Sequence, residues 1–137
     1  MNGKTLMMLK PRILRRNQAL SEIKSMIERV GCRISNKIIC KPGRDFWVEF
    51  YEHNSTKDWF PDFLDFIDSE EVVFLIINGP DRGDKLDFET WFRNLFLPLR
   101  NIYGQDSRAN AFHMSDGKEM AKREVSLIIK YELGRVK

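Results

Sequence analysis

A short, continuously apolar segment near the middle of the chain constrains the fold more than any other feature. Residues 72–77 read Val-Val-Phe-Leu-Ile-Ile, without a polar residue that could face solvent, and Asn78-Gly79-Pro80 follows them. A run of this length is too short to span a membrane, and the Asn-Gly-Pro triplet is typical of a turn. The segment is therefore predicted to be a β-strand that other elements cover on both faces.

Apolar residues at helical spacing lie on either side of this strand in the sequence. Ala19, Ile23 and Ile27 make one such set, between Asn17 as a candidate N-cap and Gly31 as a stop signal. The patterns predict helices over residues 19–30, 45–52, 58–67, 88–96 and 116–131, and further strands over residues 5–9, 32–40 and 111–113. This alternation predicts one domain of 137 residues in which helices cover a sheet.

The charge of the chain is mixed. It has 23 basic and 20 acidic side chains, for a formal net charge of +3, which agrees with a nucleotide partner without requiring one. Arg12, Arg15 and Arg16 form a basic cluster, which is interpreted as a solvated loop because no aromatic residues alternate with it. Neither a membrane-spanning run nor a signal peptide is visible.

The two cysteines indicate a reducing compartment. Cys32 and Cys40 belong to no metal-binding or redox motif, and strict alternation would place both on one face of the strand, too far apart to form a disulfide. We therefore expect reduced thiols in small core residues, and a cytoplasmic protein. The sequence also contains no cluster with the spacing of metal ligands.

The segment around His113 carries the clearest chemical signal. His113 ends a short apolar run, and Ser115 and Asp116 follow it as candidate N-caps, with Glu119 three residues after Asp116 as in a capping box. The histidine is thus expected where a strand leads into a helix N-terminus, whose backbone N–H groups attract anions. A histidine held beside a phosphate could attack the phosphorus atom.

Other candidates are weaker when taken singly. Lys10 ends a predicted central strand, where ligands of such sheets collect, although a solvated loop lysine is the commoner case. Arg93 and Arg100 flank a helix end, where arginines are usually surface residues. Tyr51, taken alone, is what an aromatic residue of the core would be. Trp59 lies at a helix start, where a partly exposed indole could stack on a base.

Glu124 is more specific, because it shares the apolar face of the last helix with Met120 and Ile128. A buried carboxylate needs a partner, since leaving its charge unpaired is costly. A contact back to His113 and Ser115 is one possibility, and a salt-bridged or partly solvated side chain is the other. His53, at a helix end, is interpreted as solvated.

Several segments, in the right order and over nearly the whole chain, resemble the nucleoside diphosphate kinase family. Residues 108–116 are similar to the family's Asn-x-x-His-Gly-Ser-Asp signature, and Thr-Leu-Met-Met-Leu-Lys-Pro at residues 5–11 is similar to its opening strand. The other matching stretches are residues 49–53 with 59–61, which resemble the helical hairpin that frames the base, residues 72–79 and residues 121–124. The resemblance implies a ferredoxin-like, four-stranded antiparallel sheet covered by helices.

The resemblance also implies a role for each candidate. His113 would be the nucleophile that becomes phosphohistidine, and Ser115 and Glu124 would hold its imidazole in orientation. Trp59 takes the position of the ring that stacks on the base. The phosphates and ribose would be contacted by Lys10, Tyr51, Arg93, Arg100 and Asn110, of which Lys10 and Tyr51 also belong to the catalytic group.

The activity that this resemblance implies is ping-pong transfer of a γ-phosphate from ATP or another nucleoside triphosphate to a nucleoside diphosphate. Mg²⁺ would be held mainly by the nucleotide phosphates, with no metal ligands of its own on the chain. Nucleotides are then the expected partners, with neither a membrane nor a nucleic acid. A homo-oligomer, dimeric or larger, is expected on the same ground.

Departures from the family pattern support an alternative, a non-catalytic nucleotide-binding or interaction module that retains the fold. Its basis is the shortened loop between Arg93 and Arg100, on which the placement of Arg93 depends, and Met114 in place of the small residue after the histidine. Arg12, in place of an acidic residue, is a further departure. Single-stranded nucleic-acid binding through Trp59 and the basic loop is a third, weaker hypothesis.

Overall fold

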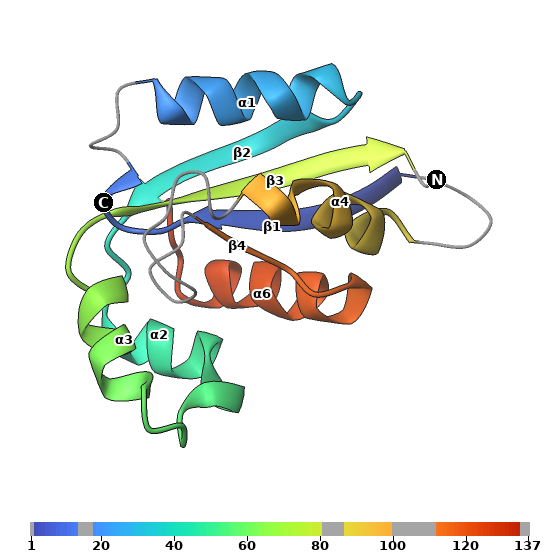
Figure 1. Cartoon of the computed structure of the whole chain (residues 1–137). Helices are drawn as coiled ribbons and strands as arrows, with labels where there is room; N and C mark the ends of the chain where they lie inside the picture. The colour runs from blue at the N-terminus through green and yellow to red at the C-terminus, as the bar shows by residue number, and fades with distance from the viewer. Residues whose placement is uncertain (1, 14–17, 81–86, 100–111, 135–137) are drawn as a thin grey trace.

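The computed structural model describes residues 2–13, 18–80, 87–99 and 112–134. Strands and helices alternate along the chain, as the sequence predicts (Figure 1). The elements are β1 (Asn2–Leu9), α1 (Ala19–Arg29), β2 (Arg33–Cys40), α2 (Arg44–Phe50), the 3-10 helix η2 (Glu52–Asn54), α3 (Phe60–Ile67), β3 (Val72–Pro80), α4 (Phe88–Phe96), the 3-10 helix η3 (Leu97–Leu99), β4 (Phe112–Met114) and α6 (Lys118–Lys130).

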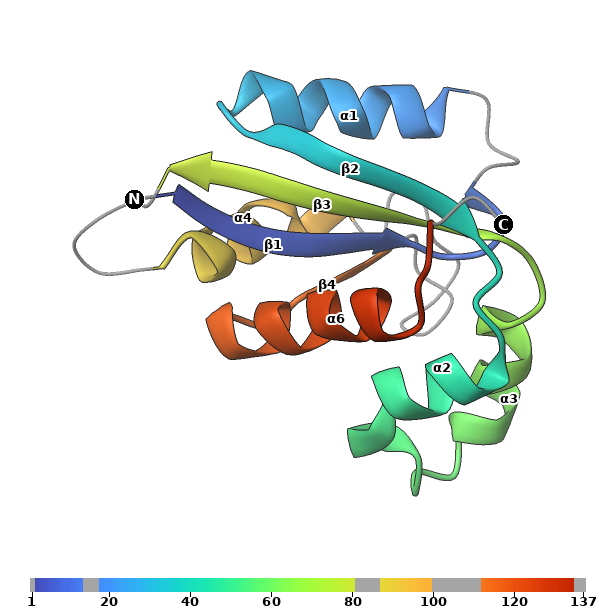
Figure 2. The same cartoon turned by 180° about the vertical axis from the view of Figure 1, so that it is seen from behind.

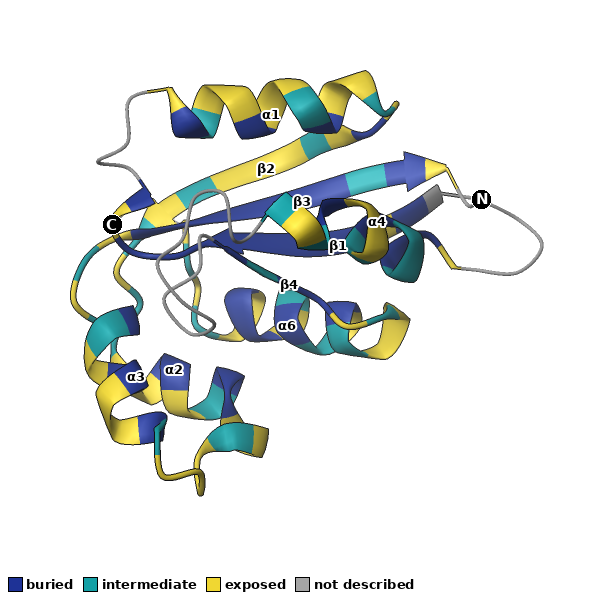
Figure 3. Ribbon diagram, viewed as in Figure 1, coloured by how far each residue is buried: buried dark blue, intermediate teal, exposed yellow. Residues whose placement is uncertain are grey.

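The four described strands form one sheet in the order β2-β3-β1-β4. Every neighbouring pair is antiparallel, which confirms the ferredoxin-like arrangement. The apolar run at residues 72–77 lies in β3, and five of its six side chains are fully buried while Ile76 is 8% exposed. Strand β3 is therefore covered on both faces, as its composition requires (Figure 3).

Helices cover both faces of the sheet and enclose two hydrophobic cores. Helices α1 and α4 lie over one face, and α6 with the α2–α3 pair lies over the other (Figures 1 and 2). Strand β1 serves both cores through simple alternation, because Met7 and Leu9 pack on the first and Leu6 and Met8 on the second. Neither core therefore depends on one helix alone.

The pairing of β4 with β1 decides which way the histidine points. His113 lies opposite Met8 in an antiparallel register, and opposed residues place their side chains on the same face. Met8 belongs to the core under α2, α3 and α6. His113 consequently faces these three helices, whereas Phe112 and Met114 pack into the other core.

Strand β3 is longer than its apolar run. Asn78, Gly79 and Pro80 were predicted to form a turn, but they continue the strand by pairing with the residues that begin β1. The paired glycines Gly3 and Gly79 leave a slot that Phe88 of α4 fills, and a Cβ on either glycine would collide with that ring. This packing, which the local sequence does not reveal, keeps the triplet in the sheet.

Strand β2 contradicts the prediction that both cysteines lie on one face. The register with β3 shifts between Ile34 and Asn36, and this irregularity interrupts the alternation of side chains. Cys32 therefore belongs to the core under α1 and α4, and Cys40 packs against the core on the opposite face. Both side chains are thiols, Cys32 buried within its core and Cys40 half-buried.

Helix boundaries differ from the predicted ones by a few residues. Helix α6 begins at Lys118 with Gly117 as its N-cap, and no side chain caps it. The predicted capping roles of Ser115 and Asp116 are therefore wrong, and the Ser115 hydroxyl has another partner. Helix α2 ends at Phe50, so that Glu52 falls in the separate turn η2.

Other helix predictions hold, except that the N-cap of α1 is Gln18 and not Asn17, which lies outside the described residues. Helix α3 carries Pro61 in its first turn, where the missing N–H costs nothing, and Asp87 caps α4 by accepting a hydrogen bond from the Thr90 N–H. Gly31 ends the α1 segment with φ +84°, in the left-handed region that favours glycine. Within the described ranges, no helix has the length and apolarity needed to cross a membrane.

Candidate functional site

A cavity of about 500 Å³ opens beside β4, on the face that His113 occupies. Its volume lies in the usual range for a site that binds a small molecule. Lys10, which follows β1, contributes to it together with residues from β4, from α4, from α6 and from the α2–α3 segment. The described lining residues are Lys10, Phe50, Tyr51, His53, Asn54, Trp59, Phe63, Arg93, His113, Met114, Asp116, Met120 and Glu124.

Glu124 connects the histidine to a serine at the base of this cavity. Its Oε2 lies 2.9 Å from Nε2 of His113, and its Oε1 accepts a hydrogen bond of 2.6 Å from the Ser115 hydroxyl. Glu124 is 1% exposed and Ser115 is fully buried, whereas the His113 side chain is 21% exposed. Both oxygens of the carboxylate are thus held by hydrogen bonds, and the imidazole is the most exposed of the three side chains.

The hydrogen bond determines how the imidazole can react. A carboxylate accepts hydrogen bonds, so Nε2 of His113 carries the proton that it donates to Glu124. In a neutral imidazole the lone pair then resides on Nδ1. With the ring neutral, this arrangement leaves the Nδ1 lone pair able to act as a nucleophile, and Glu124 can stabilise the positive charge that develops on the ring when Nδ1 forms a bond.

Aromatic side chains from the α2–α3 segment form one wall. The ring centroids of Phe50 and Tyr51 lie 5.2 and 5.8 Å from that of His113, both nearly edge-on. Phe63 packs against Tyr51 and Trp59 at 4.9 and 5.7 Å. Trp59, the N-cap residue of α3, is partly exposed, as its place at a helix start predicts, and it lines the cavity.

Two cations of the expected set face the cavity. Lys10 is 4% exposed, and its Nζ lies 5.5 Å from the centroid of the Phe63 ring. Arg93 of α4 has its Nε 3.7 Å from Oδ1 of Asp116, whose side chain is 78% exposed. An exposed pair of this kind is weak, so Arg93 is available to an anion that competes with Asp116.

The structure brings together most of the residues predicted for the site. Arg100 and Asn110 lie outside the described residues. His53 is exposed, as the sequence predicts, and it also belongs to the lining of the cavity. Sequence reasoning missed Phe50 and Phe63, although Phe63 follows Trp59 by one helical turn and could have been found from that spacing. The cavity brings together the remaining predicted residues, with Ser115 bound to Glu124 behind them. Those that line it are Lys10, Tyr51, Trp59, Arg93, His113 and Glu124.

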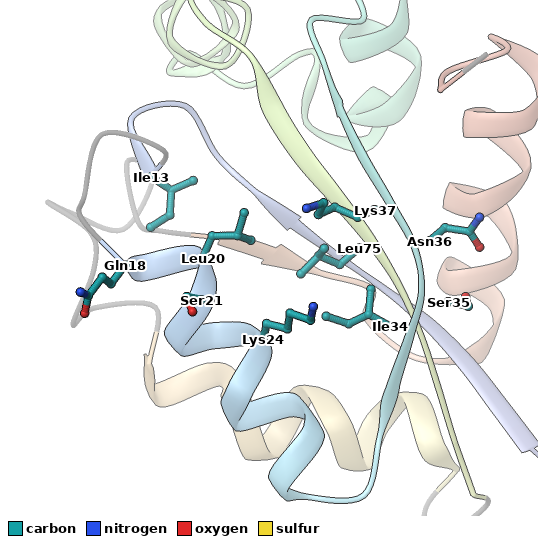
Figure 4. Close-up of a pocket in the computed structure, with 10 residues that line it drawn as sticks. All are labelled: Ile13, Gln18, Leu20, Ser21, Lys24, Ile34, Ser35, Asn36, Lys37 and Leu75. Atoms are coloured by element: carbon teal, nitrogen blue, oxygen red, sulfur yellow. The ribbon is translucent and has the colours of Figure 1, made fainter. Parts of the chain in front are cut away.

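A second cavity is larger but offers less chemistry. It has a volume of about 620 Å³ and lies between α1 and β2, above Leu75 of β3 (Figure 4). Lys24 and Lys37 are the titratable groups among its described lining residues. It lacks, within that lining, a nucleophile paired with a base, so the cavity at His113 is the better candidate for catalysis.

The arrangement of carboxylates at the site does not form a metal cage. No group of three His, Cys, Asp or Glu side chains is placed to hold an ion within the ranges that the structure describes. Glu124 already accepts two hydrogen bonds, and Asp116 faces Arg93. A divalent ion at this site would therefore take most of its ligands from a bound molecule.

Comparison with known proteins agrees with this geometry. The family model described as nucleoside diphosphate kinase matches residues 3–85. A nucleoside diphosphate kinase from Sulfurisphaera tokodaii is 31% identical over 135 residues, which cover 94% of this chain and 90% of the relative. A nucleoside diphosphate kinase from Acanthamoeba polyphaga mimivirus is 28% identical, with 90% of each chain covered.

Solved structures show the same fold. A nucleoside diphosphate kinase from Encephalitozoon cuniculi superposes with a TM-score of 0.79 at 23% identity, covering 98% of this chain and 94% of the other. The enzyme from Aquifex aeolicus gives a TM-score of 0.74 at 24% identity, covering 93% and 95%. The sequence and structural similarities together establish that this chain belongs to the nucleoside diphosphate kinase family.

Proposed function

We propose that the chain transfers the γ-phosphate of a nucleoside triphosphate to a nucleoside diphosphate through a phosphorylated His113. The observation that carries this proposal is the buried Glu124 carboxylate 2.9 Å from Nε2 of His113, which leaves Nδ1 as the nucleophile in a cavity of nucleotide size. The family to which the chain belongs supports the same activity.

In the first half-reaction, the Nδ1 lone pair of His113 attacks the γ-phosphorus. A P–N bond forms while the bond from the γ-phosphorus to the bridging oxygen breaks, and the electron pair leaves with the nucleoside diphosphate. The Nε2–H remains donated to Glu124, so the carboxylate offsets the positive charge of the phosphorylated ring. The Ser115 hydroxyl keeps Glu124 in place during this step.

The second half-reaction reverses the first with another nucleotide. A terminal phosphate oxygen of a nucleoside diphosphate attacks the phosphorus on Nδ1, the P–N bond breaks, and its electron pair returns to the ring. The first nucleoside diphosphate leaves the cavity before the second one binds there, and the phosphoryl group stays on His113 in between. The kinetics are therefore ping-pong. No water takes part, and His113 regains the neutral state in which it began.

An aromatic side and a cationic side of the cavity both contribute to binding of the nucleotide. Trp59 offers a face on which a base stacks, and stacking without hydrogen bonds to base edges implies tolerance for different bases. Lys10 and Arg93 neutralise phosphate charge. By resemblance to the family, Arg100 and Asn110 contact the phosphates and ribose as well.

Magnesium fits this site as a partner of the nucleotide. The acidic groups on the described lining are engaged with His113, Ser115 and Arg93, so we propose that Mg²⁺ is held mainly by phosphate oxygens. Bound in this way, the ion would neutralise part of the phosphate charge as the phosphoryl group transfers. The protein's own cations Lys10 and Arg93 share that task.

Two further properties are proposed on narrower grounds. Family membership supports a homo-oligomer, dimeric or larger, which light scattering of the purified protein would test. The reduced thiols of Cys32 and Cys40 support a reducing, cytoplasmic location, which a fluorescent fusion would test.

The experiment for the proposed function is a label-and-chase assay. Purified protein incubated with γ-labelled ATP and Mg²⁺ should acquire an acid-labile, alkali-stable label that disappears when a nucleoside diphosphate is added. The His113→Ala variant should bind ADP but acquire no label. A folded wild-type protein that binds ADP and acquires no label would instead support a nucleotide-binding module without catalysis.

A further inference from the structure

Arg123, the neighbour of Glu124 in α6, reaches away from the histidine to the end of α2. Its Nη1 donates a hydrogen bond of 3.1 Å to the Phe50 carbonyl, and its Nη2 donates to the Glu49 carbonyl. The same Nη2 lies 3.3 Å from Oε1 of Glu52. One guanidinium thus joins α6 to the last turn of α2 and to the turn that follows.

These contacts satisfy a real need of the α2 terminus. The last carbonyls of a helix have no partner inside the helix and carry partial negative charge. Arg123 supplies two donors and a positive charge there, in the forked geometry that only arginine offers. Its side chain is 24% exposed, so solvent screens the interaction only in part.

The contact between Arg123 and the end of α2 lies between the aromatic wall of the cavity and the His113–Glu124 pair. Phe50, whose carbonyl Arg123 binds, packs its ring 5.2 Å from His113, and Tyr51 follows it in the chain. Glu124, the next residue after Arg123, binds His113 itself. Successive residues of α6 therefore hold the aromatic wall and the nucleophile.

We infer that Arg123 is a positioning residue, which fixes the distance between the α2–α3 wall of the nucleotide site and the His113–Glu124 pair. This inference rests on the proposed function of that cavity. Because the wall carries Trp59 and Tyr51 and contributes to binding, loss of Arg123 should weaken nucleotide binding more than it slows the chemical step. The hydrogen bond between His113 and Glu124 should persist.

A second connection between α6 and α2 provides a matched comparison. Lys130 and the Tyr131 hydroxyl bind the two carboxylate oxygens of Glu49 at 2.7 and 2.6 Å. This contact is more exposed, since the Lys130 side chain is 63% accessible, and it lies farther along α6 from Glu124. Removing it tests whether any loosening between the two helices has the same effect.

The test compares Arg123→Ala, Arg123→Lys, Lys130→Ala and the exposed neighbour variant Lys122→Ala. For Arg123→Ala we expect the Kd for ADP and the KM for ATP to rise about tenfold, the loss typical of a charge-assisted hydrogen bond. The single-turnover rate at saturating ATP should fall less than about threefold. The Kd and KM of Arg123→Lys should lie between those of Arg123→Ala and wild type. Lys130→Ala and Lys122→Ala should both have the wild-type values.

Two results would overturn the inference. One is a Kd for ADP in Arg123→Ala within about twofold of the wild-type value despite lowered thermal stability, which would show a purely structural role. The other is an equal loss of affinity in Lys130→Ala. The ADP titration requires no catalysis, so it judges Arg123 even if wild-type protein acquires no phosphate, which would refute the proposed function separately.

Discussion

Oε2 of Glu124 lies 2.9 Å from Nε2 of His113, although the two residues are eleven positions apart in the chain. The strand that carries the histidine and the helix that carries the carboxylate meet because β4 pairs with β1, over which α6 packs. This relationship selects the tautomer of the imidazole. It therefore determines which ring nitrogen can accept a phosphoryl group.

Glu124→Gln should slow the formation of phosphohistidine without preventing it. The amide keeps the size of the side chain but removes the negative charge that stabilises the ring as Nδ1 reacts. We expect the single-turnover rate to fall about 10- to 100-fold, the worth of a charge-assisted hydrogen bond. Glu119→Gln, in the exposed first turn of α6, is the control and should react at the wild-type rate. Equal rates in wild type and Glu124→Gln would contradict this role.

Ser115→Ala should affect stability more than rate. It removes a 2.6 Å hydrogen bond and leaves one oxygen of a buried carboxylate without that donor. We expect the free energy of unfolding to fall by about 1–3 kcal/mol, measured by urea denaturation, and the rate to fall less than in Glu124→Gln. Ser126→Ala, exposed on the same helix, should change neither. A Ser115→Ala protein as stable as wild type would mean that water replaces the hydroxyl.

Trp59→Ala should weaken nucleotide binding. If its indole stacks on the base, the loss is about 1–3 kcal/mol of binding free energy, which calorimetric titration with ADP would measure. Trp91→Ala is a matched control, because Trp91 packs beside the core under α1 and α4, away from the cavity. Unchanged affinity in Trp59→Ala would show that the base binds elsewhere.

Protonation of Glu49 should lower the free energy of unfolding in acid. Hydrogen bonds from Lys130 and Tyr131 hold the pKa of its carboxyl below the ordinary value of 4.5. A carboxyl whose pKa is lowered by folding contributes stability above its unfolded-state pKa, and this contribution disappears as the pH falls through the folded-state pKa. Urea denaturation of Glu49→Gln should therefore show a shallower loss of stability below pH 4.5 than wild type shows. Parallel curves would exclude this contribution.

Much of the fold follows from local patterns in the sequence. The apolar run of residues 72–77 predicts a doubly covered strand. The spacing of Phe88, Trp91, Phe92, Leu95 and Phe96 predicts an amphipathic helix, in which the three phenylalanines are buried while Leu95 is 44% exposed. Both elements form because each pattern leaves one main way to bury its side chains. The irregularity in β2 could not be predicted, because it depends on the register with β3 rather than on the residues of β2 alone.

Patterns in the sequence predicted only part of the candidate site. Helical periodicity placed Glu124 on a buried face and so required a partner, but the choice of His113 depends on strand pairing. Arg123 was missed because an arginine beside a glutamate on an amphipathic helix is usually solvated. Its main partners are backbone carbonyls, and no side-chain pattern identifies those.

The most direct measurement of the central claim is the assignment of the phosphorylated atom. Wild-type protein would be incubated with ATP and Mg²⁺, denatured in alkali, and examined by ³¹P NMR against standards phosphorylated at each imidazole nitrogen. The geometry of His113 and Glu124 predicts phosphate on Nδ1 of His113 alone, because Nε2 donates its proton to the carboxylate. Phosphate on Nε2, on another residue, or on none would contradict the account.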